Sequence, residues 1–535
     1  MKRFSVMGLV VVLIAAFAGT ALADNSANIN DTTTGMRVSR GPVVIQNASG
    51  AGTTVYLATG FAQFNNEKEA LTPNAGVSVF AIDSARTNAD GTLQKKELTG
   101  TAAMQPYANG VTLISAPVVT SKAGAGTSVF YAILAPNAQT VGSVGTGDGG
   151  AYTPANTGVT ILALDGTSGA IKWQRGIAIN GTVAGVATNA PYALVSPLTL
   201  DDESVTGSGA TLYMAVGADE ISATGTGATV YSIDADNGAV LGQYSFPGVG
   251  AARFSSTVTG FFSAPFISGN SLYVLGWDKT SAGVTLYGFA DRNNLYAGVS
   301  TVGVVNTANM DYSHAQTPTP AVSGSSIFVV AAGTGTQAGV TVYDKYDLSR
   351  RVYYTPYGAI AAGSGVSASP VTDGQYIVLC TMSAVTCYNV NNLSTNTRTW
   401  TIDLAKSYTD GTYMIFGTPA ITNGYVYIPV ADTTGANKGF VLRCVLNSTT
   451  GNPIKLSTVT EMVVADPIIS AGYIYAATYT NPTTVYQIDG GVGAVGYTDW
   501  KQFKFDKAKT GYSYDPPRKD PEPGSSGGCF ISTIQ

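Results

Sequence analysis

Apolar and polar residues alternate along most of this chain in short runs. The runs are about five to eight residues long, are rich in Val, Ile, Tyr and Phe, and are separated by Gly, Asn and Ser. Such period-two alternation between turn residues is typical of β-strands whose two sides face different surroundings. The pattern leaves no room for a helix between the strands, so an all-β fold is predicted.

A short phrase recurs through the sequence. It consists of a small residue or Thr, a Pro, two or three apolar residues, a polar turn and an alternating aromatic strand, as in SAPFISGNSLYV and TPAITNGYVYI. The prolines of the phrase are Pro42, Pro117, Pro197, Pro265, Pro320, Pro370, Pro419 and Pro467. A phrase that occurs eight times indicates eight repeated units of one architecture.

The repeated proline restricts where its strand can lie. Proline has no N–H to donate, so a sheet tolerates it where one side of a strand has no partner. The innermost strand of a propeller blade is such an edge, and a closed ring of blades buries the faces that a single blade cannot bury. Residues 41–505 are therefore predicted to form an eight-bladed β-propeller of four-stranded antiparallel blades, with seven blades as the alternative.

A second phrase follows the third strand of several repeats, as ALDGTSGAIKW and as VLNSTTGNPIK. These runs resemble the blade motif of the quinoprotein alcohol dehydrogenase-like propellers, Ala-x-Asp/Asn-x-x-Thr-Gly-x-x-x-Trp. Asp165, Gly169 and Trp173 match this motif, and Asn447 and Gly451 match it again. Most of the other repeats lack the Trp, so the resemblance concerns the fold and is no evidence of quinone chemistry.

The resemblance implies a structural role for these five residues. The Asp or Asn would cap the turn between the third and fourth strands, the Gly would take a positive φ, and the Trp would pack on the neighbouring blade. Elementary chemistry agrees, because Asx-type turns tolerate such geometry, Gly adopts φ > 0 without a Cβ penalty, and an indole offers a large contact area.

The first residues have the layout of a targeting segment. Residues 1–23 combine a basic start, an apolar run and Ala21-Leu22-Ala23, which is typical of a cleaved signal peptide. Residues 24–40 then form an N-terminal segment ahead of the propeller. No later run reaches the ~20 apolar residues of a membrane helix. We therefore predict export without a transmembrane helix, to the cell exterior or surface, with the periplasm as the alternative.

The other end of the chain differs from the repeats in composition. Residues 506–528 are charged and rich in Pro and Gly, which is typical of an extended linker. Residues 529–535 begin with Cys529-Phe530-Ile531, which resembles the Cys-Phe-Ile box near the C-termini of some secreted bacterial proteins. That resemblance implies sorting or attachment through Cys529. A free thiol without such a role is the alternative.

Composition excludes several classes of function. Charged residues make up 11% of the chain and the net charge is −5, so there is no basic stripe for nucleic acid. The chain has one histidine, His314. This argues against haem attachment, a metal site with several histidines and most catalytic triads. The quinoprotein dehydrogenases themselves carry adjacent cysteines, and this chain has none. No catalytic, cofactor-binding or metal-binding residue and no cofactor are therefore predicted.

A few acidic residues remain as ligand candidates. Asp219, Glu220, Asp278 and Asp432 are expected directly after second strands, on the face where propellers usually bind ligands, and Trp277 stands beside one of them. Solvated loop charges are the alternative interpretation of this set.

Two cysteines stand seven positions apart in the sequence VLCTMSAVTC. A two-residue turn at Ser383-Ala384 would place Cys380 opposite Cys387 across a hairpin. A disulfide and a pair of buried thiols are both compatible with this arrangement.

These observations predict an exported, non-catalytic binding or scaffold module whose partner is a protein or a glycan at the cell surface or in the periplasm. One alternative is a quinone-dependent dehydrogenase-like enzyme with a degenerate site. Another is a scaffold for outer-membrane assembly, although the cleavage point lacks the cysteine that would carry a lipid anchor.

Overall fold

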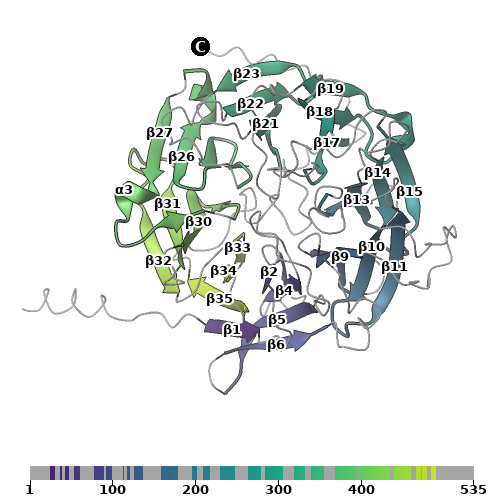
Figure 1. Ribbon diagram of the computed structural model, residues 1–535, viewed down its shortest axis with the longest axis horizontal. Coiled ribbons are helices and arrows are strands. Elements are labelled where there is room, and N and C mark those ends of the chain that lie inside the picture. The colour runs from purple at the N-terminus through teal and green to yellow at the C-terminus, as the bar shows by residue number, and fades with distance from the viewer. Residues whose placement is uncertain are drawn as a thin grey trace, which may run out of the picture.

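The computed structural model describes residues 25–29, 37–38, 43–46, 53–60, 78–89, 92–98, 112–113, 117–120, 126–135, 158–178, 196–201, 209–216, 229–246, 263–278, 283–304, 319–331, 339–354, 368–395, 397–415, 417–433, 439–459, 466–470, 473–478 and 483–489. These residues form eight antiparallel sheets arranged as the blades of a closed ring (Figure 1). The fold is an eight-bladed β-propeller, as the repeated phrases predicted.

Each blade has four strands that follow one another outward from the inside of the ring. Blade 1 consists of β3 (Val43–Gln46), β4 (Thr53–Gly60), β5 (Ser78–Thr87) and β6 (Leu93–Glu97). Blade 2 consists of β8 (Val118–Thr120), β9 (Ser128–Ala135), β10 (Gly158–Asp165) and β11 (Ile171–Ala178). Blade 3 consists of β12 (Thr199–Asp201), β13 (Thr211–Val216), β14 (Thr229–Asp234) and β15 (Val240–Ser245). Blade 4 consists of β16 (Phe266–Ser268), β17 (Ser271–Asp278), β18 (Gly283–Phe289) and β19 (Thr301–Val304).

The second half of the ring repeats this order. Blade 5 consists of β20 (Ala321–Ser323), β21 (Ser326–Ala331), β22 (Gly339–Asp344) and β23 (Arg350–Tyr354). Blade 6 consists of β24 (Val371–Thr372), β25 (Tyr376–Cys380), β26 (Ala384–Asn389) and β27 (Arg398–Asp403). Blade 7 consists of β29 (Ala420–Thr422), β30 (Tyr425–Asp432), β31 (Gly439–Val445) and β32 (Ile454–Val459). Blade 8 consists of β33 (Ile468–Ser470), β34 (Tyr473–Ala477), β35 (Thr483–Asp489) and β1 (Asn25–Ile29).

Short additional elements decorate the blades. The strands β2 (Arg37–Val38), β7 (Thr112–Leu113) and β28 (Tyr413–Met414) pair with the second strands of blades 1, 2 and 7. Short helices occur at η4 (Leu295–Ala297), η6 (Val390–Thr395) and α3 (Leu404–Ser407), where the strand pattern predicted no helix. Within the described ranges, no helix is long and apolar enough to cross a membrane.

The N-terminal segment closes the ring. Strand β1 pairs antiparallel with β35, from Asn25 opposite Gln487 to Ile29 opposite Thr483. The outer strand of blade 8 therefore comes from residues that the sequence analysis placed ahead of the propeller. This pairing covers the edge that β35 would otherwise expose. The ring is stabilised because the backbone N–H and C=O groups of that edge find partners.

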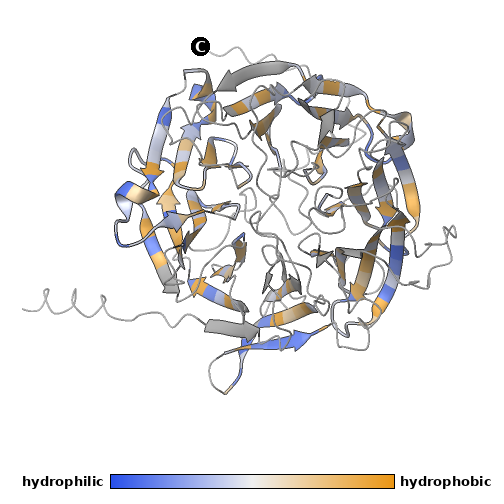
Figure 2. Cartoon of the chain, viewed as in Figure 1, coloured by the Kyte–Doolittle hydropathy of each residue, from blue (hydrophilic) through white to orange (hydrophobic). Residues whose placement is uncertain are grey.

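The hydrophobic core lies between neighbouring blades, and we call each such contact a seam. In β13 all six residues are buried, because a blade inside the ring has a neighbour on each face. At the seam of blades 8 and 1, for example, Val55, Leu57 and Phe80 pack against Ile468 and Tyr475. The outer strands are more polar: β6 has one buried residue and four exposed ones, and it is largely blue in Figure 2.

The repeated prolines precede the inner strands. Pro265, Pro320, Pro370 and Pro419, for example, stand directly before β16, β20, β24 and β29. Each of these strands pairs on one side only, with the second strand of its own blade. The missing N–H of proline therefore costs no ladder hydrogen bond, which is the reason for its position in the phrase.

Candidate functional site

The connections of the ring fall on two different faces. Because the strands of a blade are antiparallel, the connections from second to third strands and from one blade to the next leave from one face, which we call the loop face. The connections from first to second and from third to fourth strands leave from the other, the turn face. The longest connections, such as residues 136–157 and 246–265, begin and end on the loop face.

The residues before the prolines link neighbouring blades at this loop face. The backbone N–H of Thr319 in blade 5 donates to Ser369 Oγ in blade 6 at 2.8 Å. The N–H of Ser369 donates to Thr418 Oγ1 at 3.1 Å, and the N–H of Thr418 donates to Asp466 Oδ1 at 2.5 Å. All four residues are buried. This relay explains why Thr, Ser or Asp precedes proline in these repeats, a role that the phrase alone did not reveal.

The candidate ligand residues that the structure describes lie in two different blades. Asp278 and Asp432 are the last residues of the second strands β17 and β30, so both strands end at the loop face, but in blades 4 and 7. Trp277 precedes Asp278 on β17, where its backbone is opposite Val284. The other two candidates, Asp219 and Glu220, lie outside the described residues.

Asp432 is covered by the connection from blade 6 to blade 7. We call residues 404–415, which contain α3 and β28, the strap. Asp432 is 2% exposed, and its Oδ1 accepts a hydrogen bond from the Thr412 N–H at 3.3 Å. The Thr412 carbonyl in turn accepts from the Thr433 N–H at 2.8 Å. The carboxylate of Asp432 thus holds the strap against blade 7 rather than facing solvent.

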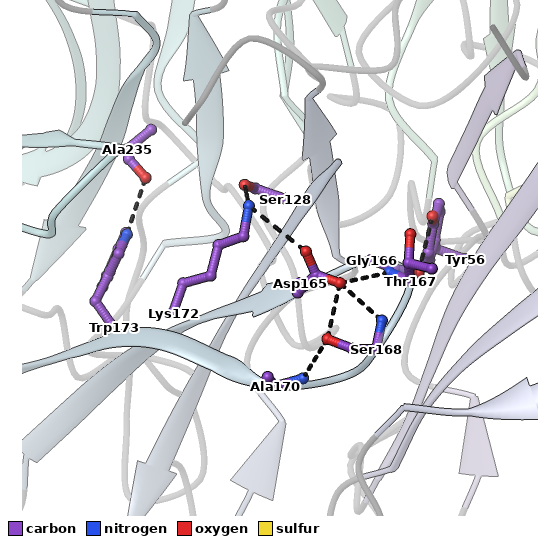
Figure 3. Close-up of polar contacts among 10 residues, drawn as sticks. All are labelled: Tyr56, Ser128, Asp165, Gly166, Thr167, Ser168, Ala170, Lys172, Trp173 and Ala235. Carbon is purple, nitrogen blue, oxygen red and sulfur yellow. Dashed lines mark hydrogen bonds and ion pairs between the residues drawn. The ribbon is translucent and has the colours of Figure 1, made fainter. Parts of the chain in front are cut away.

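The turn that resembles the quinoprotein motif is organised around Asp165 (Figure 3). Its Oδ1 accepts hydrogen bonds from the Ser168 N–H at 2.7 Å, the Thr167 N–H at 3.1 Å and the Ser168 hydroxyl at 2.8 Å. The Lys172 ammonium lies 3.9 Å from Oδ2. The Ser168 N–H in particular, with these other partners, lowers the pKa of Asp165.

Gly169 completes the same turn with a φ of +81°. A Cβ at this position would lie 2.1 Å from the Leu98 carbonyl oxygen of blade 1. Both the backbone conformation and the close approach of the neighbouring blade therefore require glycine here.

Trp173 connects this blade to the next one. Its side chain is 4% exposed, and its Nε1–H donates to the Ala235 carbonyl of blade 3 at 2.9 Å (Figure 3). Ala235 is the first residue of the turn between the third and fourth strands of blade 3. Gly238 of that turn has a φ of +73°, and a Cβ there would lie 2.6 Å from the indole ring. The indole thus lies flat against the backbone of the next blade's turn.

A second tryptophan, which stands outside the sequence motif, does the same between blades 6 and 7. Trp400 Nε1–H donates to the Leu446 carbonyl at 3.2 Å, and a Cβ at Gly451 would lie 3.0 Å from its ring. The turn that precedes Trp400 contains η6 and no glycine. The Trp itself, on an outer strand, was the only sequence signal for this contact.

The turn with Asn447 differs from the first one in register. The Asp165 N–H donates to the Ala170 carbonyl, whereas the Val445 N–H donates to the Gly451 carbonyl across a turn that is one residue longer. Val445 therefore takes the place of Asp165. Asn447 is exposed and lies two residues further on.

In blades 1, 3 and 4 a tyrosine makes the same kind of contact. In these three seams a tyrosine hydroxyl of a second strand donates to a backbone carbonyl in the turn between the third and fourth strands of the next blade. The pairs are Tyr56 to Gly166 (3.2 Å), Tyr213 to Arg292 (3.1 Å) and Tyr273 to Lys345 (2.5 Å). In the two blades that have Trp173 or Trp400, the corresponding places hold Phe130 and Val378, which have no hydroxyl.

These hydroxyls remain protonated under ordinary conditions. Burial raises the pKa of Tyr56 to about 12, with a further contribution from the negative charge of Asp165. Burial also raises the pKa of Tyr213 and Tyr273. The tyrosines are therefore available as hydrogen-bond donors up to strongly alkaline pH.

The cysteine hairpin corrects one sequence-based expectation. Cys380 is opposite Val385, and Cys387 is opposite Val378, so the two cysteines do not face each other and both are free thiols. The turn begins earlier than expected, because the Thr381 hydroxyl oxygen accepts from the Ala384 N–H at 3.0 Å. The two-residue turn therefore lies at Met382-Ser383, one position earlier than expected, and the partner of each strand residue shifts by two.

Cys380 and Cys387 are buried side chains of the hydrophobic core of blades 5 to 7. Cys387 Sγ–H donates to the Leu446 carbonyl at 3.8 Å, and burial raises the pKa of both thiols. The remaining candidates, His314 and Cys529, lie outside the described residues, as do residues 1–23, 506–528 and 529–535. Among the residues that the structure describes, no group of three or more His, Cys, Asp or Glu is placed to hold a metal ion.

Comparison by sequence identifies no relative: no family model and no curated protein matches this chain. Solved structures with a similar chain course include the Dos1 propeller, with 10% identity, 88% of this chain and 95% of that chain covered, and a TM-score of 0.42. A europium-containing methanol dehydrogenase has 12% identity over 76% of this chain and 84% of its own, with a TM-score of 0.41.

BamB from Moraxella catarrhalis has 13% identity over 65% of this chain and 99% of its own, with a TM-score of 0.33. At such identities and TM-scores these likenesses carry no argument about activity or partner. The case for function therefore depends on the residues of this chain.

Proposed function

We propose that this protein is an exported, non-catalytic β-propeller that acts as a binding or scaffold module for a protein or glycan partner at the cell surface or in the periplasm. The observation that carries the proposal is the difference between its two faces. On the turn face, backbone groups such as the Gly166, Ala235 and Leu446 carbonyls are used by neighbouring blades. The loop face, apart from the hydrogen bonds of the residues before the prolines, is where the longest connections begin and end, and such connections commonly carry binding residues.

Export is supported by the layout of residues 1–23, and attachment by the Cys529-Phe530-Ile531 run at the end of the chain. We expect Cys529→Ser to be secreted like the parent but to be lost from the cell surface. Equal surface retention of variant and parent, with equal mobility on a non-reducing gel, would remove the attachment role and leave the propeller's own role untouched.

The loop-face partner is tested with the full chain and two variants. One replaces residues 137–156 with a short Gly-Ser linker, and the other changes the exposed turn-face residue Tyr346 to Ser. We expect the first to reduce binding to envelope fractions of the producing bacterium about tenfold or more, and the second to leave it unchanged. Thermal unfolding serves as the check that both variants fold. Equal binding by all three proteins would contradict the proposal.

The competing dehydrogenase-like function is tested with pyrroloquinoline quinone and calcium. A ligand that binds the folded state raises the melting temperature by mass action, so a bound cofactor would be visible without a substrate. We expect no shift in melting temperature and no dye reduction with a panel of alcohols. A clear shift accompanied by turnover would replace the proposed function with the enzymatic one.

A further inference from the structure

Three aromatic rings enclose a common space at the seam of blades 6 and 7. Tyr408 and Tyr413 come from the strap, and Phe440 comes from β31. The ring centroids of Tyr408 and Tyr413 are 5.9 Å apart, those of Tyr408 and Phe440 are 5.3 Å apart, and those of Tyr413 and Phe440 are 5.2 Å apart. The planes are inclined at 75°, 58° and 63°, so the rings form three walls rather than a stack. We call this arrangement the cage.

The cage already holds a cation from the same chain. Lys455, from the outer strand β32, places its ammonium nitrogen 4.5 Å from the ring centroids of Tyr408 and Phe440 and 5.1 Å from that of Tyr413. Asp410 Oδ2, on the strap, lies 3.9 Å from the same nitrogen. Three ring faces and one carboxylate around a single nitrogen are the elements with which proteins bind ammonium cations.

A primary ammonium group matches these surroundings poorly. It carries three N–H donors, and aromatic faces satisfy none of them as a carbonyl or carboxylate would. No described residue accepts a hydrogen bond from Lys455 Nζ, and the Asp410 oxygen at 3.9 Å is beyond hydrogen-bonding distance. The Lys455 side chain is 31% exposed, so water remains the acceptor for its protons.

We propose that the cage is a binding site for a methylated ammonium group, which enters in place of the Lys455 ammonium. A trimethylated nitrogen has no N–H to satisfy and spreads its charge over methyl groups that contact ring faces directly. Asp410 is close enough to supply the balancing charge and too far to require a hydrogen bond. This inference concerns the seam of blades 6 and 7 and does not depend on the proposed function of the loop face.

Lys455 then sets the apparent affinity of the site. A ligand binds only those molecules in which the lysine has left the cage. The apparent Kd is therefore the intrinsic Kd divided by the fraction of molecules with an empty cage. Removing the lysine side chain should therefore tighten binding, which is opposite to the effect expected if Lys455 were a ligand contact.

The experiment titrates the full chain with tetramethylammonium chloride and follows the methyl proton resonance of the ligand. The variants are Lys455→Ala, Asp410→Asn in the Lys455→Ala background, and Lys345→Ala. Lys345→Ala is the matched control. The Lys345 ammonium nitrogen lies 5.2 Å from the centroid of one ring, that of the exposed Tyr346, rather than among three rings. Thermal unfolding shows whether each variant retains the fold.

We expect saturable binding to the parent, about tenfold tighter binding to Lys455→Ala, parent-like binding to Lys345→Ala, and weaker binding once Asp410 is also changed. Ammonium chloride should compete at least tenfold less well than tetramethylammonium. Absence of saturable binding to the parent, or equal affinity for the two ions, would overturn the proposal and leave Lys455 as a structural clamp. An unchanged affinity in Lys455→Ala would overturn it as well.

The same chemistry has two sources, a free quaternary ammonium compound or the side chain of a methylated lysine. Competition of the bound tetramethylammonium by choline and by N-acetyl-trimethyllysine amide distinguishes them. Stronger competition by the amino acid derivative assigns the cage to methylated protein, and stronger competition by choline assigns it to a small compound. Failure of both to compete would overturn the proposal.

Discussion

At the scale of single residues, the seams depend on donor groups that reach from one blade to the next. Tyr213 is fully buried, and its hydroxyl donates to the Arg292 carbonyl. We expect Tyr213→Phe to lower the free energy of unfolding by about 1–2 kcal/mol, because the carbonyl loses its partner inside the seam. Denaturant unfolding measures this. Tyr346→Phe is the matched control, since Tyr346 is 71% exposed, and an equal loss there would refute the role of the buried hydroxyl.

Trp173 adds a large apolar surface to the same kind of contact. Truncation in Trp173→Ala removes the indole from the seam of blades 2 and 3 and the hydrogen bond to Ala235. We expect a loss of about 2 to 4 kcal/mol in the free energy of unfolding. Tyr296→Ala, at a side chain that is 67% exposed, should cost almost nothing. An unchanged melting temperature for Trp173→Ala would show that the seam does not depend on this residue.

At the scale of elements, the turns between third and fourth strands are shaped by the blade before them. Gly238→Ala introduces a Cβ 2.6 Å from the Trp173 ring at a φ of +73°. Gly324→Ala is the matched control, because Gly324 also has a positive φ, +55°, but has no atom within 4 Å of the added Cβ. We expect the control to lose about 1 kcal/mol from backbone strain and Gly238→Ala to lose about 2 kcal/mol more from the clash.

A double variant separates these terms further. In the Trp173→Ala background the clash at Gly238 is gone, so Gly238→Ala should then cost no more than Gly324→Ala. Thermal or denaturant unfolding of the four proteins gives the coupling. Strictly additive losses would mean that the turn and the indole do not touch in solution.

At the scale of the whole molecule, the ring is closed by hydrogen bonds between β1 and β35. We expect a chain that begins after residue 29 to unfold at a much lower temperature and over a broader range, because blade 8 loses its outer strand. A chain that lacks residues 506–535 should unfold like the parent, since blade 8 is complete without them. Calorimetry of the two truncations compares them directly, and the opposite ranking would place ring closure at the C-terminal end.

Alkaline pH acts on the seams together. Burial raises the pKa of Tyr56 to about 12 and that of Tyr408 to about 12, against about 10 for tyrosine in an unfolded chain. Between pH values of about 10 and 12 the unfolded chain has lost tyrosine protons that the folded protein keeps. The free energy of unfolding therefore falls as pH rises through this range. Below about pH 10 these groups do not affect it. Melting temperatures measured from pH 8 to 12 check this, and a flat profile above pH 10 would contradict it.

Local and repeated features were accessible from the sequence. Strand alternation and the proline phrase recur at a fixed place in each unit, so they predicted the eight blades and the inner edge strand. This succeeds because the hydrogen bonds of a blade join strands that follow one another in the chain, and each strand must satisfy the same local periodicity.

Contacts between residues distant in the sequence needed the tertiary structure. The pairing of β1 with β35, the tyrosines that replace Trp173 in other seams, and the burial of Asp432 under the strap all join separate segments. The register that separates Cys380 from Cys387 depends on a hydroxyl contact inside one turn, which alternation does not encode. The repeat pattern in the sequence determines the strands and turns of each blade. Packing between blades decides which polar groups bond within the protein and which remain for a partner. The physical reason is that the burial of a side chain depends on the neighbouring blades and not on its own strand.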